Sequence, residues 1–155
     1  MDVELREAAS ADLPAVRRLI EEYVRGLGVD LSFQEIETEL ADLGAMYGPP
    51  RGRILLAHVS GEAAGCVALR ALEPGTCEMK RLYVRPAFRG TGLGRRLALA
   101  VIETARLLGY DRMRIDTLPQ MHAARKLYAE IGFREIEPYR FNPVPGTAFM
   151  ELELR

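Results

Sequence analysis

The sequence predicts a mixed α/β fold, in which a mostly antiparallel sheet of about seven strands is flanked by about four helices. Three observations support this. The 155 residues are enough for one hydrophobic core, so we expect a single domain over residues 1–155. Hydrophobic residues make up 48% and charged residues 28%, which is typical of a folded globular chain. Alternating and helical periodicities follow one another in the order β-α-α-β-β-β-α-β-α-β-β.

The first half of the chain predicts one strand, two helices and a three-stranded meander. Val3–Ala8 alternates as a strand does, and a helix with Pro14 in its first turn continues to Gly28. A second amphipathic helix is expected over Ser32–Tyr47, where a Gly-Pro-Pro sequence ends it. Short turns then join three antiparallel strands: Arg53–Val59, Ala63–Leu72 and Thr76–Val84.

The second half opens with a glycine-rich loop between a strand and a helix. Arg89-Gly90-Thr91-Gly92-Leu93-Gly94 precedes apolar residues at helical spacing, which continue to Gly109. After these, the sequence predicts a strand over Met113–Thr117 and a helix from Pro119 to Gly132. Two last strands, Phe133–Ile136 and Ala148–Leu154, are joined by a proline-rich segment.

Charge and composition exclude several kinds of partner. The net charge of -1 gives no bulk positive field, so we expect neither nucleic acid nor a membrane surface as a partner. No apolar run approaches the roughly 18 residues of a membrane span, and the first residues do not resemble a signal peptide, so a cytoplasmic location is expected. Two cysteines and two histidines are too few for a zinc cluster, and no metal site is predicted.

The two cysteines are expected to be free buried thiols. A turn near Pro74 would place Cys77 opposite Arg70 or Ala71, and it would place Cys66 opposite Arg81 or Leu82. The thiols would then be offset along the sheet, too far apart for a disulfide.

The glycine-rich loop predicts a phosphate site, because glycines let backbone N–H groups approach an anion that the helix dipole also favours. A nucleotide triphosphatase loop would need Lys and Ser or Thr after the last glycine, where Arg95 and Arg96 stand. A dinucleotide fingerprint would need a third glycine at one of two positions, and these hold Arg95 and Leu97. The alternative without a ligand is a tight turn.

Arg89-x-x-Gly92-x-Gly94 resembles the pyrophosphate loop of the GNAT superfamily, the acetyl-CoA-dependent N-acetyltransferases. Leu82-Tyr83-Val84-Arg85-Pro86 is similar to the strand that precedes this loop, and Ala124-x-x-Leu127-Tyr128-x-x-x-Gly132-Phe133 is similar to a second signature. The order of elements agrees over the whole chain. The resemblance implies that acetyl-CoA is the cosubstrate, bound by Leu82, Tyr83, Val84, Arg89, Gly90, Thr91, Gly92, Leu93, Gly94 and Arg95.

The resemblance also implies a bulge in this strand, which would splay it from its neighbour and aim an N–H group at the thioester oxygen. One residue departs from the family pattern. Met121 stands where many members have an asparagine that contacts the cofactor, which puts this contact in doubt.

Two catalytic residues are implied in the same way. Tyr128 would protonate the departing thiolate of CoA, and Glu78 would take the proton of the amine, with a pKa raised by burial. The alternatives are structural. Tyr128 also suits a helix core, and Glu78 also suits an ion pair with Lys80 or an arginine.

The expected reaction is direct attack of a primary amine, here of a small molecule, on acetyl-CoA in a ternary complex. Tyr139, Arg140 and Asn142 are candidates for holding this acceptor, although a solvated surface loop is an alternative. Two other functions stay open: acetylation of protein N-termini or lysines, and a non-catalytic acyl-CoA sensor or regulator with the same fold. The sequence is also compatible with a homodimer.

Overall fold

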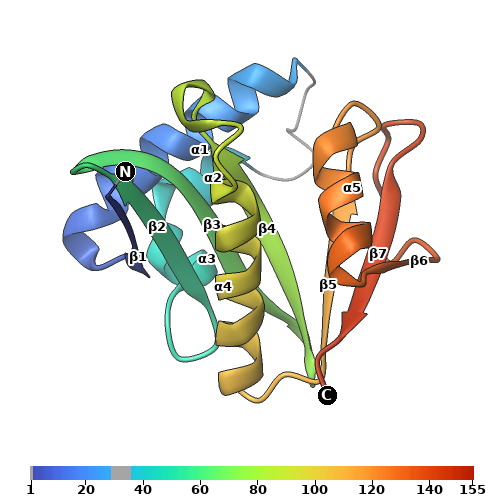
Figure 1. Cartoon of the computed structure of the whole chain (residues 1–155). Helices are drawn as coiled ribbons and strands as arrows, with labels where there is room; N and C mark the ends of the chain where they lie inside the picture. Colours follow the sequence, from blue (N-terminus) through green and yellow to red (C-terminus); the bar gives the residue numbers. More distant parts are fainter. Residues whose placement is uncertain (1, 29–35) are drawn as a thin grey trace.

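A seven-stranded sheet forms the centre of the molecule. The computed structural model describes residues 2–28 and 36–155, and its strands lie in the order β1-β2-β3-β4-β5-β7-β6. Only the pair β4–β5 is parallel, which confirms the mixed, mostly antiparallel sheet (Figure 1). The strands are β1 (Val3–Glu7), β2 (Arg53–Val59), β3 (Glu62–Glu73), β4 (Thr76–Val84), β5 (Arg112–Thr117), β6 (Arg134–Ile136) and β7 (Ala148–Glu153).

Helices cover both faces of the sheet. One face carries α1 (Leu13–Leu27), α2 (Ile36–Ala41) and α3 (Leu43–Tyr47), and the other carries α4 (Leu93–Leu107) and α5 (His122–Ile131) (Figure 1). Within the described residues there are also two 3₁₀ turns, Ser10–Asp12 and Pro86–Phe88. Over the two described ranges, none of the helices has the length and apolar composition that a membrane span requires.

The single helix predicted over Ser32–Tyr47 is wrong. Its described part is two short helices, which makes five helices in the described chain where about four were expected; Ser32 itself lies outside the described residues. Asp42 causes the break, because its backbone leaves the helical region and its Oδ1 accepts a hydrogen bond from the Ala45 N–H at 3.0 Å. A side chain that caps a new helix competes with continuation of the old one.

Other predicted ends shift by small amounts. The last helix begins at His122 and not at Pro119, because the Met121 N–H turns back to the Leu118 carbonyl at 3.0 Å. The predicted strand ends differ from the observed ones by at most one residue, and those of Arg53–Val59 and Thr76–Val84 agree at both ends. The order of strands and helices is otherwise as predicted, apart from the broken helix.

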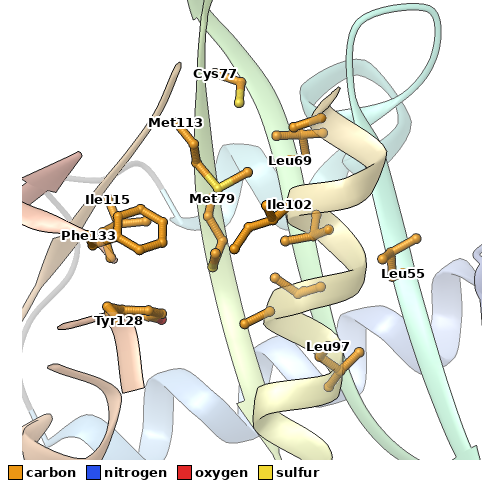
Figure 2. Close-up of a cluster of buried hydrophobic side chains, with 14 of the residues drawn as sticks. Leu55, Leu69, Cys77, Met79, Leu97, Ile102, Met113, Ile115, Tyr128 and Phe133 are labelled. Atoms are coloured by element: carbon orange, nitrogen blue, oxygen red, sulfur yellow. The ribbon is translucent and has the colours of Figure 1, made fainter. Parts of the chain in front are cut away.

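Two hydrophobic clusters hold the layers together. The larger lies between the sheet and the helices α4 and α5, and Figure 2 shows its centre, where Met79 and Met113 lie close to Ile102 of α4 and Ile115 lies beside Phe133. The smaller lies under α1 and α3. Each cluster contains one cysteine, and both thiols are free and buried.

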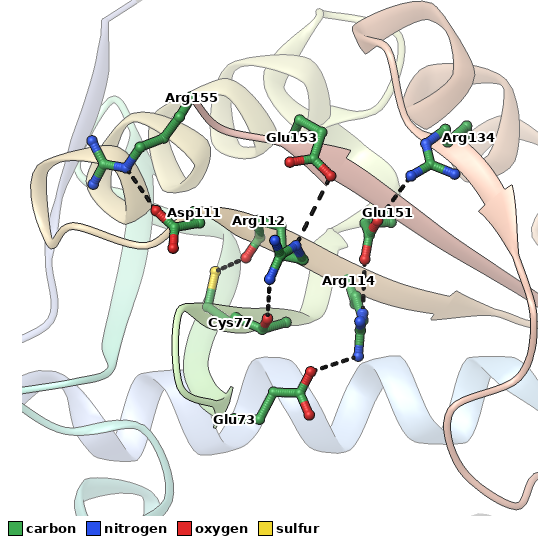
Figure 3. A network of polar contacts seen from close by, with 10 residues as sticks. Glu73, Cys77, Asp111, Arg112, Arg114, Arg134, Glu151, Glu153 and Arg155 are labelled. Carbon is green, nitrogen blue, oxygen red and sulfur yellow. Dashed lines mark hydrogen bonds and ion pairs between the residues drawn. The ribbon is translucent and has the colours of Figure 1, made fainter.

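Polar contacts fix one end of β5 between its neighbours. The Arg114 guanidinium bonds Glu151 of β7 at 2.9 Å and Glu73 at the end of β3 at 3.2 Å, and Arg134 of β6 joins the same Glu151 (Figure 3). This is the end at which β4 and β5 are paired, from Thr76 opposite Arg112 to Glu78 opposite Arg114. Both strands continue beyond Glu78 and Arg114, but the ladder between them stops there.

A bulge in β4 lies just beyond this point. The register with β3 shifts between the pairs Cys66–Tyr83 and Ala68–Lys80, and Arg81 takes a φ of 60° in the left-handed region. Cys66 therefore faces Tyr83. Its predicted position opposite Arg81 or Leu82 is wrong, because the bulge shifts the register of the two strands. Cys77 faces Ala71, as predicted.

An ion pair holds the bulged residue. The Arg81 Nε and Nη2 donate to the two carboxylate oxygens of Glu39 in α2, each at 2.9 Å, and both side chains are almost completely buried. A left-handed backbone is unfavourable for a residue with a Cβ, so a strong contact must stabilise it. The pair ties α2 to the bulge in β4.

We therefore expect Glu39→Ala to lower the free energy of unfolding by roughly 3–5 kcal/mol, because it leaves the Arg81 charge buried and without this partner. Urea unfolding measures the change. Glu37→Ala is the matched control, since Glu37 lies exposed in the same short helix and its loss should change stability by about 0.5 kcal/mol at most. Equal stability of the two variants would contradict the role given to this pair.

Candidate active site

A groove lies where β4 separates from β5. It has a volume of about 410 Å³ and runs between the end of β4, the start of α4 and the start of α5. Five of the predicted cofactor residues line it together: Leu82, Tyr83, Val84, Arg89 and Gly94. From the opposite wall come Met121, Ala124 and Leu127, so the two sequence signatures that resemble the GNAT pattern meet at one groove.

The glycine-rich loop caps one end of this groove. Gly90 and Gly92 have φ of 79° and 82°, and Gly92 is the N-cap residue that precedes α4. The Thr91 hydroxyl donates to the Phe88 carbonyl at 2.7 Å, and the Arg89 Nε donates to the Val84 carbonyl at 2.9 Å. These contacts tie the loop to β4, and they mean that the Arg89 side chain is already bonded to the protein.

The loop leaves a set of N–H groups without partners. In the part of the chain that the structure describes, no hydrogen bond is found from the backbone N–H groups of residues 90–95, and the first helical bond of α4 comes from Arg96. The Leu93 side chain is buried in the core, so only its backbone faces the loop, whereas Arg95 is exposed. N–H groups at the start of a 15-residue helix favour an anion.

A second, smaller cavity continues from the groove. Its volume is about 30 Å³, and it shares Tyr23, Leu27, Leu82 and Met121 with the groove. The further lining residues come from both sides of the split in the sheet: Met79, Lys80 and Arg81 from β4, Ile115 and Asp116 from β5, and Leu118 and Tyr128. We call it the inner cavity. It exists because the bulged β4 and β5 no longer pair at this level.

Tyr128 is both a core residue and a wall of the inner cavity. Its ring packs against Phe133 with centroids 5.5 Å apart, and both residues lie beside Ile115 in Figure 2. Burial raises the pKa of the Tyr128 phenol above its usual range. The hydroxyl therefore stays protonated at any working pH and is able to donate a hydrogen bond.

Glu78 lies in an ion-pair cluster next to the inner cavity and is not one of its lining residues. Arg70 donates to its Oε1 at 3.0 and 2.9 Å, and its Oε2 accepts from the Tyr139 hydroxyl at 2.7 Å and pairs with Arg140. Burial raises the pKa of this carboxyl, but the charges of Lys80, Arg140 and Arg70 outweigh burial and lower it overall. The sequence predicted a raised pKa for this carboxyl, and that prediction is wrong. The structural alternative, an ion pair with an arginine, is present.

The loop between β6 and β7 supplies two of the three predicted acceptor residues to this cluster. Tyr139 and Arg140 both contact Glu78, and Arg140 also lies over the Tyr139 ring. Asn142 does not join them, because its Oδ1 accepts a hydrogen bond from the Val144 N–H at 2.9 Å within its own loop. An acceptor carboxylate that paired with Arg140 would have to compete with Glu78.

Three residues of this region were not predicted. Glu39 and Glu22 hold β4 to helices α2 and α1, since Glu22 accepts hydrogen bonds from Arg85 and from the Tyr83 hydroxyl. Asp116 lines the inner cavity, and its buried Oδ2 has no hydrogen-bond partner in the part of the chain that the structure describes. The sequence gives only weak signals for them: an acid inside an amphipathic segment, and a polar residue near the end of a strand.

Comparison with known proteins agrees with these features. The model of the acetyltransferase (GNAT) family matches residues 14–133. An uncharacterized N-acetyltransferase of Schizosaccharomyces pombe is 45% identical over 145 residues, which covers 92% of this chain and 89% of that protein. The N-acetylaspartate synthetase of Danio rerio is 34% identical over 120 residues, which covers 76% of this chain and 43% of that protein.

A solved structure shows the same fold. The putative acetyltransferase yncA of Salmonella typhimurium, determined with its cofactor acetyl-CoA, superposes with a TM-score of 0.71 at 24% identity, covering 99% of this chain and 94% of that one. The family model spans both signatures and the groove between them. The chain therefore belongs to the GNAT family of acetyltransferases and is an acetyl-CoA-dependent acyltransferase.

Proposed function

We propose that the protein transfers the acetyl group of acetyl-CoA to the primary amine of a small molecule, by direct attack in a ternary complex. The observation that carries the proposal is the inner cavity. It adjoins the bulge in β4, opens into the groove and includes the Tyr128 side chain in its wall. Donor and acceptor can therefore meet at one point, out of bulk water.

The proposed position of acetyl-CoA follows from the groove and the loop. The pyrophosphate would accept hydrogen bonds from the N–H groups of residues 90–95, with the exposed Arg95 beside it. The pantetheine arm would lie along Leu82, Tyr83 and Val84, where β4 has no partner on the side of β5. The backbone beyond the bulge would then face the thioester oxygen.

The chemical step forms one bond and breaks another. The neutral amine nitrogen attacks the thioester carbonyl carbon, the C–N bond forms, and the C–S bond breaks with its electron pair going to sulfur. The phenol of Tyr128 would stabilise the thiolate by a hydrogen bond, because its raised pKa keeps the proton on oxygen. One proton leaves the amine and one reaches the sulfur, so the overall reaction is neutral.

The size of the inner cavity supports a small acceptor, because about 30 Å³ holds roughly one or two waters, or one charged group. The N-acetylaspartate synthetase of Danio rerio, named for an acetylated amino acid, is a further point in favour. In this proposal Glu78 positions the Tyr139–Arg140 segment beside the site through its contacts. The resemblance implies a different role for Glu78, that of the general base, and the pH dependence of a variant distinguishes the two roles.

Gly92→Val should weaken acetyl-CoA binding by about tenfold or more, as measured by calorimetry. Valine is strained at a φ of 82°, and its side chain would project where the phosphates approach the backbone. Gly61→Val is the matched control, because Gly61 has the same φ and the same open surroundings in the turn between β2 and β3. Equal affinities in the two variants would contradict a pyrophosphate site at this loop.

Tyr128→Phe should lower kcat about 100-fold, with acetyl-CoA affinity and the unfolding midpoint close to wild type. The ring keeps its packing against Phe133, and only the hydroxyl is lost. The assay follows CoA release with a panel of primary amines. Tyr47→Phe is the control, since Tyr47 is equally buried but packs in the smaller cluster under α1 and α3.

Turnover of Tyr128→Phe within about twofold of wild type would make Tyr128 a core residue only. Tight acetyl-CoA binding by the wild-type protein without CoA release on any amine would favour the acyl-CoA sensor. Release with peptides and with none of the small amines would favour acetylation of proteins.

Glu78→Gln separates the two roles of this carboxylate by the pH profile of kcat/KM. For a positioning residue, we expect a profile that runs parallel to wild type, because the same group titrates in both. For a base, the defect would be largest near neutral pH and shrink at high pH, where more of the amine is already neutral. The second profile would overturn the positioning role.

Stability gives an independent readout of the same variant. The pKa of Glu78 is lower in the folded protein than its usual value, so its contribution to stability is present above the unfolded pKa and is lost as pH falls through the folded one. The free energy of unfolding of the wild-type protein, measured in urea, should therefore fall as the pH drops below about 4.5, the ordinary pKa of such a carboxyl. In Glu78→Gln, the part of this fall that comes from Glu78 should be missing.

A further inference from the structure

The inner cavity is lined by two opposite charges, Lys80 and Asp116, that form no ion pair with each other or with the other residues that the structure describes. Lys80 is 5% exposed, and no hydrogen bond or ion pair to its ammonium is found from any residue in the ranges 2–28 and 36–155. Asp116 lines the same cavity, and its Oδ2 is buried without a hydrogen-bond partner within those ranges. An unpaired buried charge is unfavourable, so such groups are retained for a reason other than stability.

The charges around them are paired. Glu39 bonds Arg81, and the two oxygens of Glu78 are taken by Arg70, Arg140 and the Tyr139 hydroxyl. Lys80 adds its charge to the field at Glu78, but no hydrogen bond or ion pair joins the two side chains among the described residues. Burial and the neighbouring Arg81 lower the Lys80 pKa to about 8, although the charges of Glu78 and Asp116 act in the opposite direction.

The splay of the sheet explains why Lys80 and Asp116 are left apart. The last pair between β4 and β5 is Glu78 with Arg114, and Lys80 and Asp116 each lie two residues further along. Side chains two residues apart in a strand point to the same face, so continued pairing would bring these two charges together. Because the strands separate at this level, the inner cavity opens between them, and no ion pair joins them.

We propose that the acceptor is an amino acid, whose carboxylate pairs with Lys80 and whose ammonium is held by Asp116. This inference rests on the proposed transfer of acetyl to a small amine, and it names the class of that amine. A zwitterion satisfies both unpartnered groups at once, whereas a simple amine would leave Lys80 unpaired. The Tyr128 side chain lines the same cavity, so the amine would lie beside the place proposed for the thioester sulfur.

The same argument disfavours a protein substrate. A peptide N-terminus or a lysine side chain carries an amine without a carboxylate next to it, and neither would satisfy Lys80. The cavity has room for roughly one or two waters, which suits the charged end of a small molecule, and it opens into the groove through Leu82 and Met121.

The test compares amino acids with analogues that lack the carboxylate charge. Wild-type protein and acetyl-CoA are incubated with the common L-amino acids, their α-amides and the corresponding decarboxylated amines, and CoA release gives kcat and KM. We expect the best amino acid to exceed its amide in kcat/KM by roughly 100-fold, because the amide leaves the Lys80 charge unpaired.

Two variants test whether Lys80 and Asp116 cause the preference for the amino acid over its amide. Lys80→Met keeps an unbranched side chain, one heavy atom shorter, and removes the charge, so the preference for acid over amide should fall to about threefold or less, chiefly through a higher KM for the acid. Asp116→Asn should raise KM for acid and amide alike, because both carry the ammonium. Lys126→Met is the matched control, since Lys126 is the only other lysine of the chain and lies exposed on α5.

Unfolding separates recognition from a structural role. Lys80→Met removes an unpaired buried charge, so it should be at least as stable as wild type towards urea. A marked loss of stability, with the preference for amino acids unchanged, would show that Lys80 serves the fold and would overturn the inference.

Failure of the inference differs from failure of the proposed function. Efficient acetylation of amides and simple amines, with no gain from the carboxylate, would overturn the inference and leave acetyl transfer to small amines intact. Tight acetyl-CoA binding with no turnover on any member of the panel would overturn both. An amino-acid preference that persists in Lys80→Met would overturn the assignment to Lys80.

Discussion

The bulge at Arg81, held by its buried ion pair with Glu39, is the constraint on which the rest of the site depends. A strand with a left-handed residue in its middle cannot continue a regular ladder, and here that residue is an arginine whose guanidinium is fixed by α2. The sheet therefore stays intact on the side of β3 and parts on the side of β5. Every feature that we assign to catalysis lies at or beyond this point.

The groove and the inner cavity both exist because β4 and β5 separate. At the closed end, Arg114 holds β5 to Glu151 of β7 (Figure 3). At the open end, the groove and the inner cavity occupy the space where the ladder would have continued. Polar side chains that would otherwise pair across the strands are left facing a cavity. The same departure from regular structure thus creates room for a cofactor and leaves charges available to a substrate.

Much of the fold could be predicted from the sequence, because local patterns carry it. Alternation, helical spacing and turn residues predict the order of the strands and nearly all of the helices. The exception is the segment up to Tyr47, where periodicity continues through Asp42 although the helix does not: whether an aspartate caps a new helix or lies within an old one depends on its local hydrogen bonds.

The site could be predicted only where a motif marks it. The loop at Gly90–Arg95 and the helix with Tyr128 each carry a recognisable spacing, and the structure brings them to one groove. The partners of charged residues are a property of the tertiary structure: the sequence left open whether Glu78 pairs with Lys80 or an arginine, and it could not show that Arg70 and Arg140 take this place among the described residues. The bulge was expected, but the glutamate that holds it comes from a distant helix and has no sequence signature.

A crystal structure of the protein with acetyl-CoA tests the central claim most directly, because it locates the thioester relative to the split in the sheet. We expect the acetyl carbonyl oxygen within about 3 Å of a backbone N–H just beyond the bulge, with the sulfur facing the Tyr128 hydroxyl. We also expect β4 and β5 to remain unpaired beyond Glu78. A complex in which the two strands pair along their whole length, or in which the thioester lies outside the split, would contradict the account.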